Sequence, residues 1–133
     1  MDLVLVVSER DGVPVLAVHG EVDLATVPRL RNQLVALNAS YPGVTLVVDL
    51  DGVTALDATG LGVLVGGLGQ RRWAGGDLAV VCASEALRAH LALCRLDRVF
   101  ELHETATAAV AAAAAASSEA RGAASGAEAQ ARS

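Results

Sequence analysis

Apolar residues along the chain fall into two alternating kinds of segment. Short continuous apolar runs bounded by turn residues indicate strands, and stretches with apolar residues every three or four positions indicate amphipathic helices. Strands are expected over residues 3–8, 13–19, 45–50, 78–83 and 99–102, and helices over residues 26–38, 60–73, a segment that starts at Ser84, and 105–116. Strands that alternate with helices predict an α/β domain with a mostly parallel sheet.

The first two strands are predicted to form an antiparallel hairpin. They are joined by Arg10-Asp11-Gly12, and Asp-Gly between strand-like segments is a strong hairpin signal. Pro14 has no N–H to donate to a ladder, so the early part of the second strand is expected at an edge or beside a bulge. The predicted sheet is therefore mixed, with a hairpin first and parallel strands after it.

The helix over residues 60–73 carries two stripes. Leu61, Leu64, Val65 and Leu68 form its apolar stripe, and Gly62, Gly66 and Gly69 form a second stripe beside it. Each interior glycine costs a helix about 0.5–1 kcal/mol relative to alanine. Two explanations stay open: close packing against the sheet or a neighbouring helix, or a partner that docks on the stripe.

Length and composition favour one domain with an aliphatic core. The chain has 133 residues, of which 53% are hydrophobic, yet only one Trp, one Tyr and one Phe. Residues 1–116 are expected to form the domain, with Thr26 as a helix cap and Pro28 in that helix's first turn. Residues 117–133 offer no apolar side chain larger than alanine, so this tail is expected to be disordered.

Charge and the absence of lysine exclude several functions. The net charge is −5, which argues against nucleic-acid binding. Without lysine there is no Schiff base, no P-loop lysine and no receiver-domain lysine. The N-terminus does not read as a signal peptide and no segment could span a bilayer, so a cytoplasmic protein without membrane insertion is expected. Cys82 and Cys94 lack metal-ligand spacing and are expected in the core, and neither a metal nor a cofactor is expected.

Thr59 is the candidate for chemistry. It is predicted as the N-cap of the glycine-rich helix, with Asp57 just before it, and a purely structural cap is one interpretation. A phosphate there would lie among free N–H groups at the positive end of the helix dipole. It would add about −1.5 to −2 charges beside Asp57 and, if the neighbouring loop shares that sheet edge, near Glu21 and Asp23. Such a phosphate is expected to alter partner binding more than folding.

Three segments together resemble a known family. Residues 20–26 (Gly-Glu-Val-Asp-Leu-Ala-Thr), 48–53 (Val-Asp-Leu-Asp-Gly-Val) and 56–64 (Leu-Asp-Ala-Thr-Gly-Leu-Gly-Val-Leu) are similar, in order and spacing, to the STAS domain of bacterial anti-sigma factor antagonists. The resemblance covers about residues 3–112. In that family the residue before the Gly of an Asp-Ser-Ser/Thr-Gly-Leu-Gly element carries the phosphate, and here that residue is Thr59. Ala58 departs from the usual Ser or Thr, and Thr59 replaces a more common Ser.

The resemblance implies a STAS-like fold and a partner switch. The unmodified chain would bind an anti-sigma factor that is also a serine/threonine kinase, which frees a sigma factor. ATP-dependent phosphorylation of Thr59 would end binding, and a PP2C-type phosphatase would restore it; the ATP and metal would belong to the partners. The implied partner-binding residues are Glu21, Asp23, Asp57, Ala58, Gly60, Leu61 and Gly62. A homo-oligomer stays open, since an exposed glycine stripe would suit an interface.

Two other classes of function compete with this interpretation. A STAS-type scaffold or accessory module of a sensory or transport complex would use Thr59 only as a cap. An enzyme is disfavoured because the GxGxxxG spacing from Gly60 is not the GxGxxG of a dinucleotide site. Asp49, Asp51 and Asp57 suggest a metal or phosphoryl-accepting site only weakly, with Asp51 expected in a turn. The remaining titratable candidates, on separate elements, are His19, His90 and His103.

Overall fold

The computed structural model describes residues 3–117. Its elements are β1 (Val4–Arg10), β2 (Val13–Val22), α1 (Val27–Ser40), β3 (Thr45–Leu56), α2 (Ala58–Trp73), β4 (Asp77–Val81), α3 (Glu85–Leu93), the 3₁₀ turn η1 (Leu96–Arg98) and β5 (Glu101–His103), followed by a C-terminal helix over residues 106–117. The five strands form one sheet in the order β1-β2-β3-β4-β5. The β1–β2 pair is antiparallel and the other three pairs are parallel, so the predicted α/β fold with a leading hairpin is confirmed.

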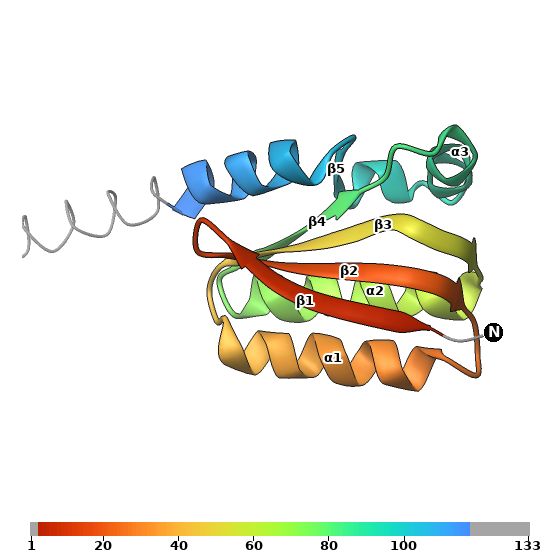
Figure 1. Cartoon of the computed structure of the whole chain (residues 1–133), viewed down its shortest axis with the longest axis horizontal. Coiled ribbons are helices and arrows are strands. Elements are labelled where there is room, and N and C mark those ends of the chain that lie inside the picture. The colour runs from red at the N-terminus through yellow and green to blue at the C-terminus, as the bar shows by residue number, and fades with distance from the viewer. Residues whose placement is uncertain (1–2, 118–133) are drawn as a thin grey trace, which may run out of the picture.

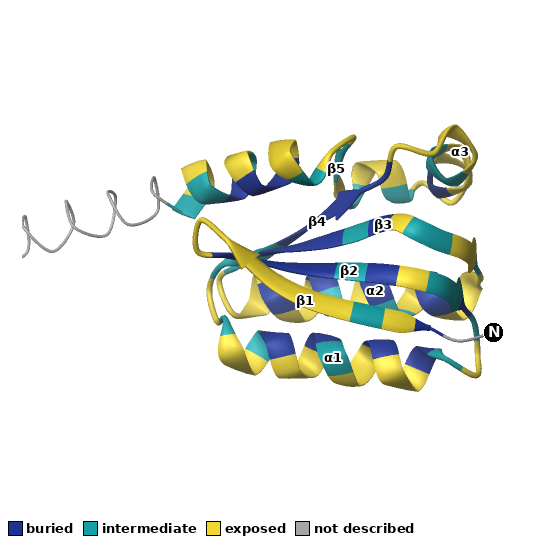
Figure 2. Cartoon of the chain, viewed as in Figure 1, coloured by how far each residue is buried: buried dark blue, intermediate teal, exposed yellow. Residues whose placement is uncertain are grey.

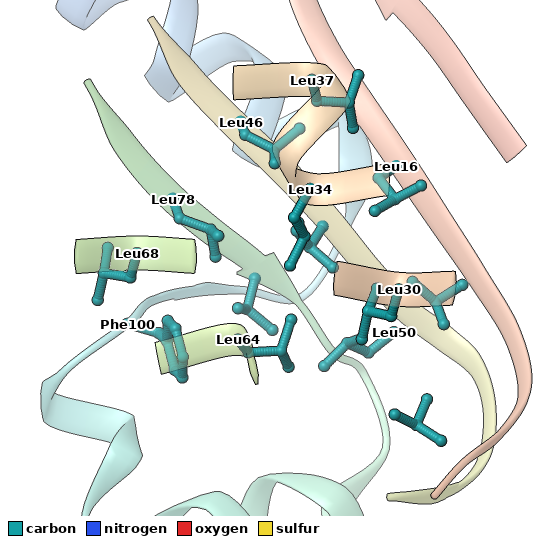
Figure 3. Packing of buried hydrophobic residues seen from close by; sticks show 14 of the residues in the cluster. Leu16, Leu30, Leu34, Leu37, Leu46, Leu50, Leu64, Leu68, Leu78 and Phe100 are labelled. Atoms are coloured by element: carbon teal, nitrogen blue, oxygen red, sulfur yellow. The ribbon is translucent and has the colours of Figure 1, made fainter. Parts of the chain in front are cut away.

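Helices cover both faces of the sheet (Figure 1). α1 and α2 lie on one face, where large aliphatic side chains from alternate strand positions meet them (Figure 3). This cluster includes Leu16, Leu30, Leu34, Leu46, Leu50, Leu64, Leu68 and Leu78, with Phe100 as its one buried aromatic residue. The C-terminal helix packs on the opposite face through Ala109, Val110 and Ala113. Successive strand residues point to opposite faces of the sheet. Because helices cover both faces, residues of either orientation are buried in the central strands (Figure 2), and the strands read as near-continuous apolar runs.

The hairpin turn is made by Asp11 and Gly12, whose φ angles are both positive, at 52° and 78°. Asp-Gly suits this conformation because glycine has no Cβ and aspartate tolerates the left-handed region. Pro14 pairs with Glu9 of β1, and the register of β2 with β3 begins only at Val15. The early part of β2 therefore has no β3 neighbour, as the missing N–H of Pro14 predicts.

Two strands are longer than predicted. β3 continues past residue 50 to Leu56, so Asp51 is in a strand and its predicted place in a turn is wrong. β2 likewise continues through Gly20 and Glu21 to Val22, which shortens the predicted loop. The register between β2 and β3 shifts twice at this end of the sheet, between Ala17 and His19 and between Gly20 and Glu21. Such irregularities hide the strand pattern in the sequence.

Other details differ in smaller ways. The last strand is β5, two residues later than predicted at its start. Cys82 is buried as expected, but Cys94 is exposed at the C-cap of α3, so its predicted core position is wrong. Ser84 does cap α3, accepting a hydrogen bond from Leu87 N at 3.3 Å. The C-terminal helix includes residue 117, and the rest of the predicted tail lies outside the described residues.

Arg71 of α2 is a buried charge with only 2% exposure. Its guanidinium donates to Val44 O at 2.7 Å, to Leu37 O at 3.3 Å and to Asn38 Oδ1 at 3.4 Å. It thereby ties α2 to the end of α1 and to the loop that leads into β3. Burial lowers the pKa of Arg71, yet arginine keeps its charge because its ordinary pKa is so high.

Candidate functional site

The carboxyl ends of β2 and β3 bring the predicted site residues together. Asp57 follows β3, and its backbone N–H donates to Val22 O at the end of β2 at 3.1 Å. The turn over residues 23–26 therefore lies next to the start of α2. This loop and Thr59 therefore lie at the same end of the sheet, which is the condition under which a phosphate on Thr59 would lie near Glu21 and Asp23.

Asp57, rather than Thr59, is the N-cap of α2. Its Oδ1 accepts the backbone N–H of Gly60 at 3.0 Å, which is the usual bond of a capping aspartate. Thr59 lies in the first turn, and its Oγ1 donates to the same Oδ1 at 2.5 Å. The prediction of Thr59 as cap is wrong because the helix begins at Ala58, two residues before the predicted start at residue 60. The Thr59 hydroxyl is thus exposed but held in place by the cap.

The carboxylate of Asp57 is stabilised in its charged form. The hydrogen bond from Thr59 is the main cause that lowers its pKa below the ordinary 3.8, and backbone N–H groups of Gly60, Thr59 and Leu24 add to it. A carboxylate with several donors binds protons weakly. At neutral pH Asp57 is therefore an anion that accepts hydrogen bonds, and a poor base for the Thr59 hydroxyl.

Asp23 shapes the neighbouring turn. Its Oδ1 accepts the N–H groups of Ala25 at 3.0 Å and Thr26 at 3.1 Å. Thr26 precedes α1 but does not cap it through its side chain: its Oγ1 donates to Glu21 O at 2.9 Å and accepts from Asp23 N at 3.0 Å. Pro28 lies in the first turn of α1, as predicted. The two loop acids therefore flank an ordered turn at the sheet edge.

An apolar groove of about 540 Å³ starts at Thr59 and runs between α1 and α2. Exposed Leu24 stands in the turn beside its mouth, at 74% exposure, and Val35 on α1 is 52% exposed. Among the described residues that line the groove, Arg31 is the only charged one. Its lining residues are Leu24, Val27, Pro28, Arg31, Leu34, Val35, Thr59, Gly62, Val63, Gly66, Gly67 and Gln70.

The glycine stripe forms an open surface of α2. A Cβ built on Gly62, Gly66 or Gly69 would meet no atom within 4 Å outside the helix. Close packing therefore does not explain these glycines, and the docking explanation remains. Different glycines are packed closely: a Cβ on Gly60 would lie 2.5 Å from Val22 Cγ1, and one on Gly67 would lie 3.2 Å from Leu34 Cδ1.

The predicted partner-binding residues divide by exposure. Asp57, Ala58 and Gly62 are exposed beside Thr59. Gly60 and Leu61 are buried and hold the first turn of α2 against the sheet. Sequence reasoning missed Leu24, Arg31 and Val35. Leu24 carried a signal, since a large apolar residue in a turn of small and acidic residues has no place in the core.

Other candidate chemistry is not brought together. Within residues 3–117, no group of three or more His, Cys, Asp or Glu side chains could hold a metal ion. Asp49 Oδ1 accepts Asp51 N at 2.9 Å, and Asp51 Oδ1 accepts Ala83 N at 2.8 Å. Asp49 thus holds backbone within β3, and Asp51 holds the backbone that follows β4. His19 lies over the backbone of Gly52, where a Cβ would be only 2.0 Å from its Nδ1.

Comparison with known proteins gives a consistent picture. Residues 5–104 match the family model described as "Mlab, STAS domain". The chain is 30% identical over 103 residues to the anti-sigma-F factor antagonist RsfB of Mycobacterium tuberculosis, an alignment that covers 77% of this chain and 83% of RsfB. It is 31% identical to the anti-sigma-B factor antagonist of Listeria monocytogenes, over 77% of this chain and 82% of that protein.

Solved structures agree. The crystal structure of an anti-sigma factor antagonist from Mycobacterium paratuberculosis superposes with a TM-score of 0.77 at 33% identity, covering 84% of this chain and 94% of that one. In the part of this chain that the structure describes, no helix has the length and apolarity needed to cross a membrane. With a STAS model matching most of its length and relatives that are anti-sigma factor antagonists, the chain belongs to the STAS domain family of anti-sigma factor antagonists.

Proposed function

We propose that this chain is an anti-sigma factor antagonist that switches partners through Thr59. In its unmodified form it binds an anti-sigma factor that is also a serine/threonine kinase, and this releases a sigma factor. Phosphorylation of Thr59 ends the binding, and a PP2C-type phosphatase restores it. The observation that carries the proposal is the exposed Thr59 hydroxyl, held by Asp57 at the start of α2 and at the mouth of an apolar groove.

The chemistry is a transfer of the γ-phosphoryl group of ATP to Thr59 Oγ1. A bond forms between Oγ1 and phosphorus, the bond from phosphorus to the ADP oxygen breaks, and the hydroxyl proton leaves. Asp57 now holds that proton in a hydrogen bond, but its lowered pKa makes it a poor acceptor for a full proton transfer. The kinase therefore supplies the base, along with the ATP and the metal ion.

The modification acts through charge. It adds about −1.5 to −2 charges at pH 7 next to the carboxylate of Asp57, close to the turn that Asp23 orders. It also removes the proton that Thr59 donates to Asp57. A phosphate can share the backbone N–H groups at the start of α2 that Asp57 engages. The fold therefore persists while the surface at the groove mouth becomes larger and more negative.

Incubation with a candidate anti-sigma kinase and ATP, followed by mass spectrometry, tests the proposal. Cleavage at arginine yields a peptide over residues 32–71 that also holds Ser40, Thr45 and Thr54. The phosphate must therefore be placed by fragmentation of this peptide. Thr59→Val, which keeps the shape and removes the hydroxyl, is the matched control and is expected to take no phosphate.

Binding is measured with the same kinase. Thr59→Val is expected to bind as the unmodified chain does, and Thr59→Glu is expected to bind more weakly because it adds a charge beside Asp57. A modified chain that binds as tightly as the unmodified one would refute release by charge. An absence of phosphate on Thr59 with every co-encoded kinase would instead favour a STAS scaffold in which Thr59 only supports the cap.

A further inference from the structure

β1 leaves one edge of the sheet open. It pairs with β2 over all seven of its residues without a register shift, and within residues 3–117 no strand lies on its other side. The backbone N–H and C=O groups on that side are a template for another strand. The opposite edge, β5, has only three residues and offers much less.

β1 lacks several of the features that usually protect an edge, and its only charged residues, Glu9 and Arg10, lie at its end. It contains no proline and no lysine, and it has no bulge against β2, whereas protected edges rely on such features. Val4, Val6 and Val7 are exposed by 50%, 49% and 41%. β-branched residues also favour the extended conformation. The exposed valines and the free backbone groups lie along the same strand.

α1 holds β1 in place at both ends. Arg29 of α1 donates to Leu3 O at 2.6 Å, just before β1 begins. Tyr41, after the end of α1, donates to Glu9 Oε2 at 3.3 Å near the end of β1. The edge is therefore an ordered surface that pays little entropy on pairing, because its backbone is already extended.

We propose that this edge binds a second copy of the chain, with β1 antiparallel to β1 around a two-fold axis at Val7. A two-fold axis perpendicular to the sheet places equivalent faces of the two sheets on the same side. With Val7 opposite Val7, each residue of β1 has a partner: Val4 faces Arg10, Leu5 faces Glu9 and Val6 faces Ser8. The sheets of the two copies become continuous, and the shared interface is isologous.

Charge in the segment is compatible with self-pairing. β1 carries one acid and one base, Glu9 and Arg10, so the edge is neutral although the whole chain has a net charge of −5. Around the Val7 axis these residues lie at opposite ends of the paired strands, so no like charges meet. An axis at Glu9 would instead place two carboxylates face to face.

A second copy suits this edge better than the chain's own C-terminal segment. Residues 118–133 contain no β-branched and no aromatic residue, the types that favour strands. β1 itself has three valines in its first four residues. The self-complementary strand is therefore the better partner, and this argument is independent of the role of Thr59.

Light scattering after size exclusion tests the proposal on the full chain over a range of concentrations. A dimer is expected, with twice the 13.5 kDa mass of the chain. Val6→Lys is expected to give the monomer, because the two Val6 side chains are diagonal neighbours across the axis and lysines there would repel each other. Val35→Lys is the matched control on α1, since Val35 is 52% exposed against 49% for Val6, and it is expected to remain dimeric.

A cysteine pair tests the register. In a Cys94→Ser background, Val7→Cys is expected to form a disulfide between copies, because directly opposite Cβ atoms lie about 4.5–5.5 Å apart. Glu9→Cys in the same background is expected not to cross-link. A wild-type monomer at every concentration, or a dimer that survives Val6→Lys, overturns the proposal. A dimer lost only in Val35→Lys would place the interface in the helix groove and overturn it as well.

Discussion

Replacing the three open glycines of α2 by alanine should stabilise the domain. Gly62, Gly66 and Gly69 lie inside the helix, and a Cβ on any of them meets no atom within 4 Å outside it. Alanine in a helix interior is favoured over glycine by about 0.5–1 kcal/mol. Because nothing offsets this gain at the three positions, the triple variant is expected to unfold with a free energy higher by about 1.5–3 kcal/mol.

Urea unfolding followed by circular dichroism measures the change. Gly60→Ala is the control on the same helix, since its Cβ would lie 2.5 Å from Val22 Cγ1 and 2.7 Å from Leu56 Cδ1. Val22 is buried and β-branched, so it cannot move aside at low cost, and Gly60→Ala is expected to lower stability. A triple variant that is no more stable than the parent would show that these glycines have a structural role within the chain.

The same variant separates stability from binding. If the partner docks on this glycine stripe, three added methyl groups should weaken binding of the anti-sigma kinase while the domain becomes more stable. Isothermal titration with the partner measures the affinity. Unchanged affinity in the stabilised variant would mean that the partner does not contact this stripe. That result would not bear on the proposed phosphorylation of Thr59.

Three further changes test other parts of the structure. Arg71→Ala is expected to lower the free energy of unfolding by at least about 2 kcal/mol, since it removes the hydrogen bonds to Val44, Leu37 and Asn38 and leaves a cavity in place of a buried side chain. Arg71→Lys should not restore the stability, because one ammonium cannot span the three acceptors of the guanidinium. Equal stability of Arg71→Lys and the parent in urea would refute this. Thr59→Val is expected to raise the pKa of Asp57 toward 3.8 in a carbon-13 titration, because the Thr59 hydrogen bond is the main cause that lowers it. The hydrogen bond stabilises the fold at pH values above the unfolded-state pKa of Asp57, and this stabilisation is lost as the pH falls through the folded-state pKa. The difference in unfolding free energy between Thr59→Val and the parent should therefore shrink in strong acid. A difference as large in strong acid as at neutral pH would contradict this. Iodoacetamide should alkylate exposed Cys94 in the native state and leave Cys82 unmodified, since Cys82 is buried and burial raises the pKa of its thiol. Mass spectrometry measures how fast each cysteine is alkylated. Rapid alkylation of both would show that β4 opens.

The pattern of the sequence predicts the elements well because the two packing faces leave clear signatures. The apolar run at residues 45–50 reads as a buried strand since α1 and α2 cover one side and the C-terminal helix covers the other. The pattern does not predict the strand where it continues beyond one of its neighbouring strands. Residues 51–56 of β3 extend beyond its pairing with β4, which ends at Asp49, and they contain an acid, a glycine and a threonine that resemble a turn.

The sequence predicts where the candidate site lies, but it does not predict the role of each residue in the site. Asp57 and Thr59 both suit a helix start, and a shift of two residues decides which one caps it. The same ambiguity affects the glycines: spacing places Gly60, Gly62 and Gly66 on one helix, but only the tertiary structure shows that the first is packed and the others are open. Contacts between distant segments, such as Val22 over Gly60, leave no local pattern.

One oxygen, Asp57 Oδ1, accepts both the hydroxyl of Thr59 and the N–H of Gly60. Esterification of that hydroxyl leaves it with no proton to donate, and the incoming phosphoryl oxygens are themselves acceptors. Carboxylate and phosphoryl group would then compete for the few amide protons of one helical turn. If Thr59 is phosphorylated as proposed, whatever favours the intact turn, including a partner bound to it, would disfavour the ester by the same factor. Amide hydrogen exchange at Gly60 would report the state of the switch without any partner present.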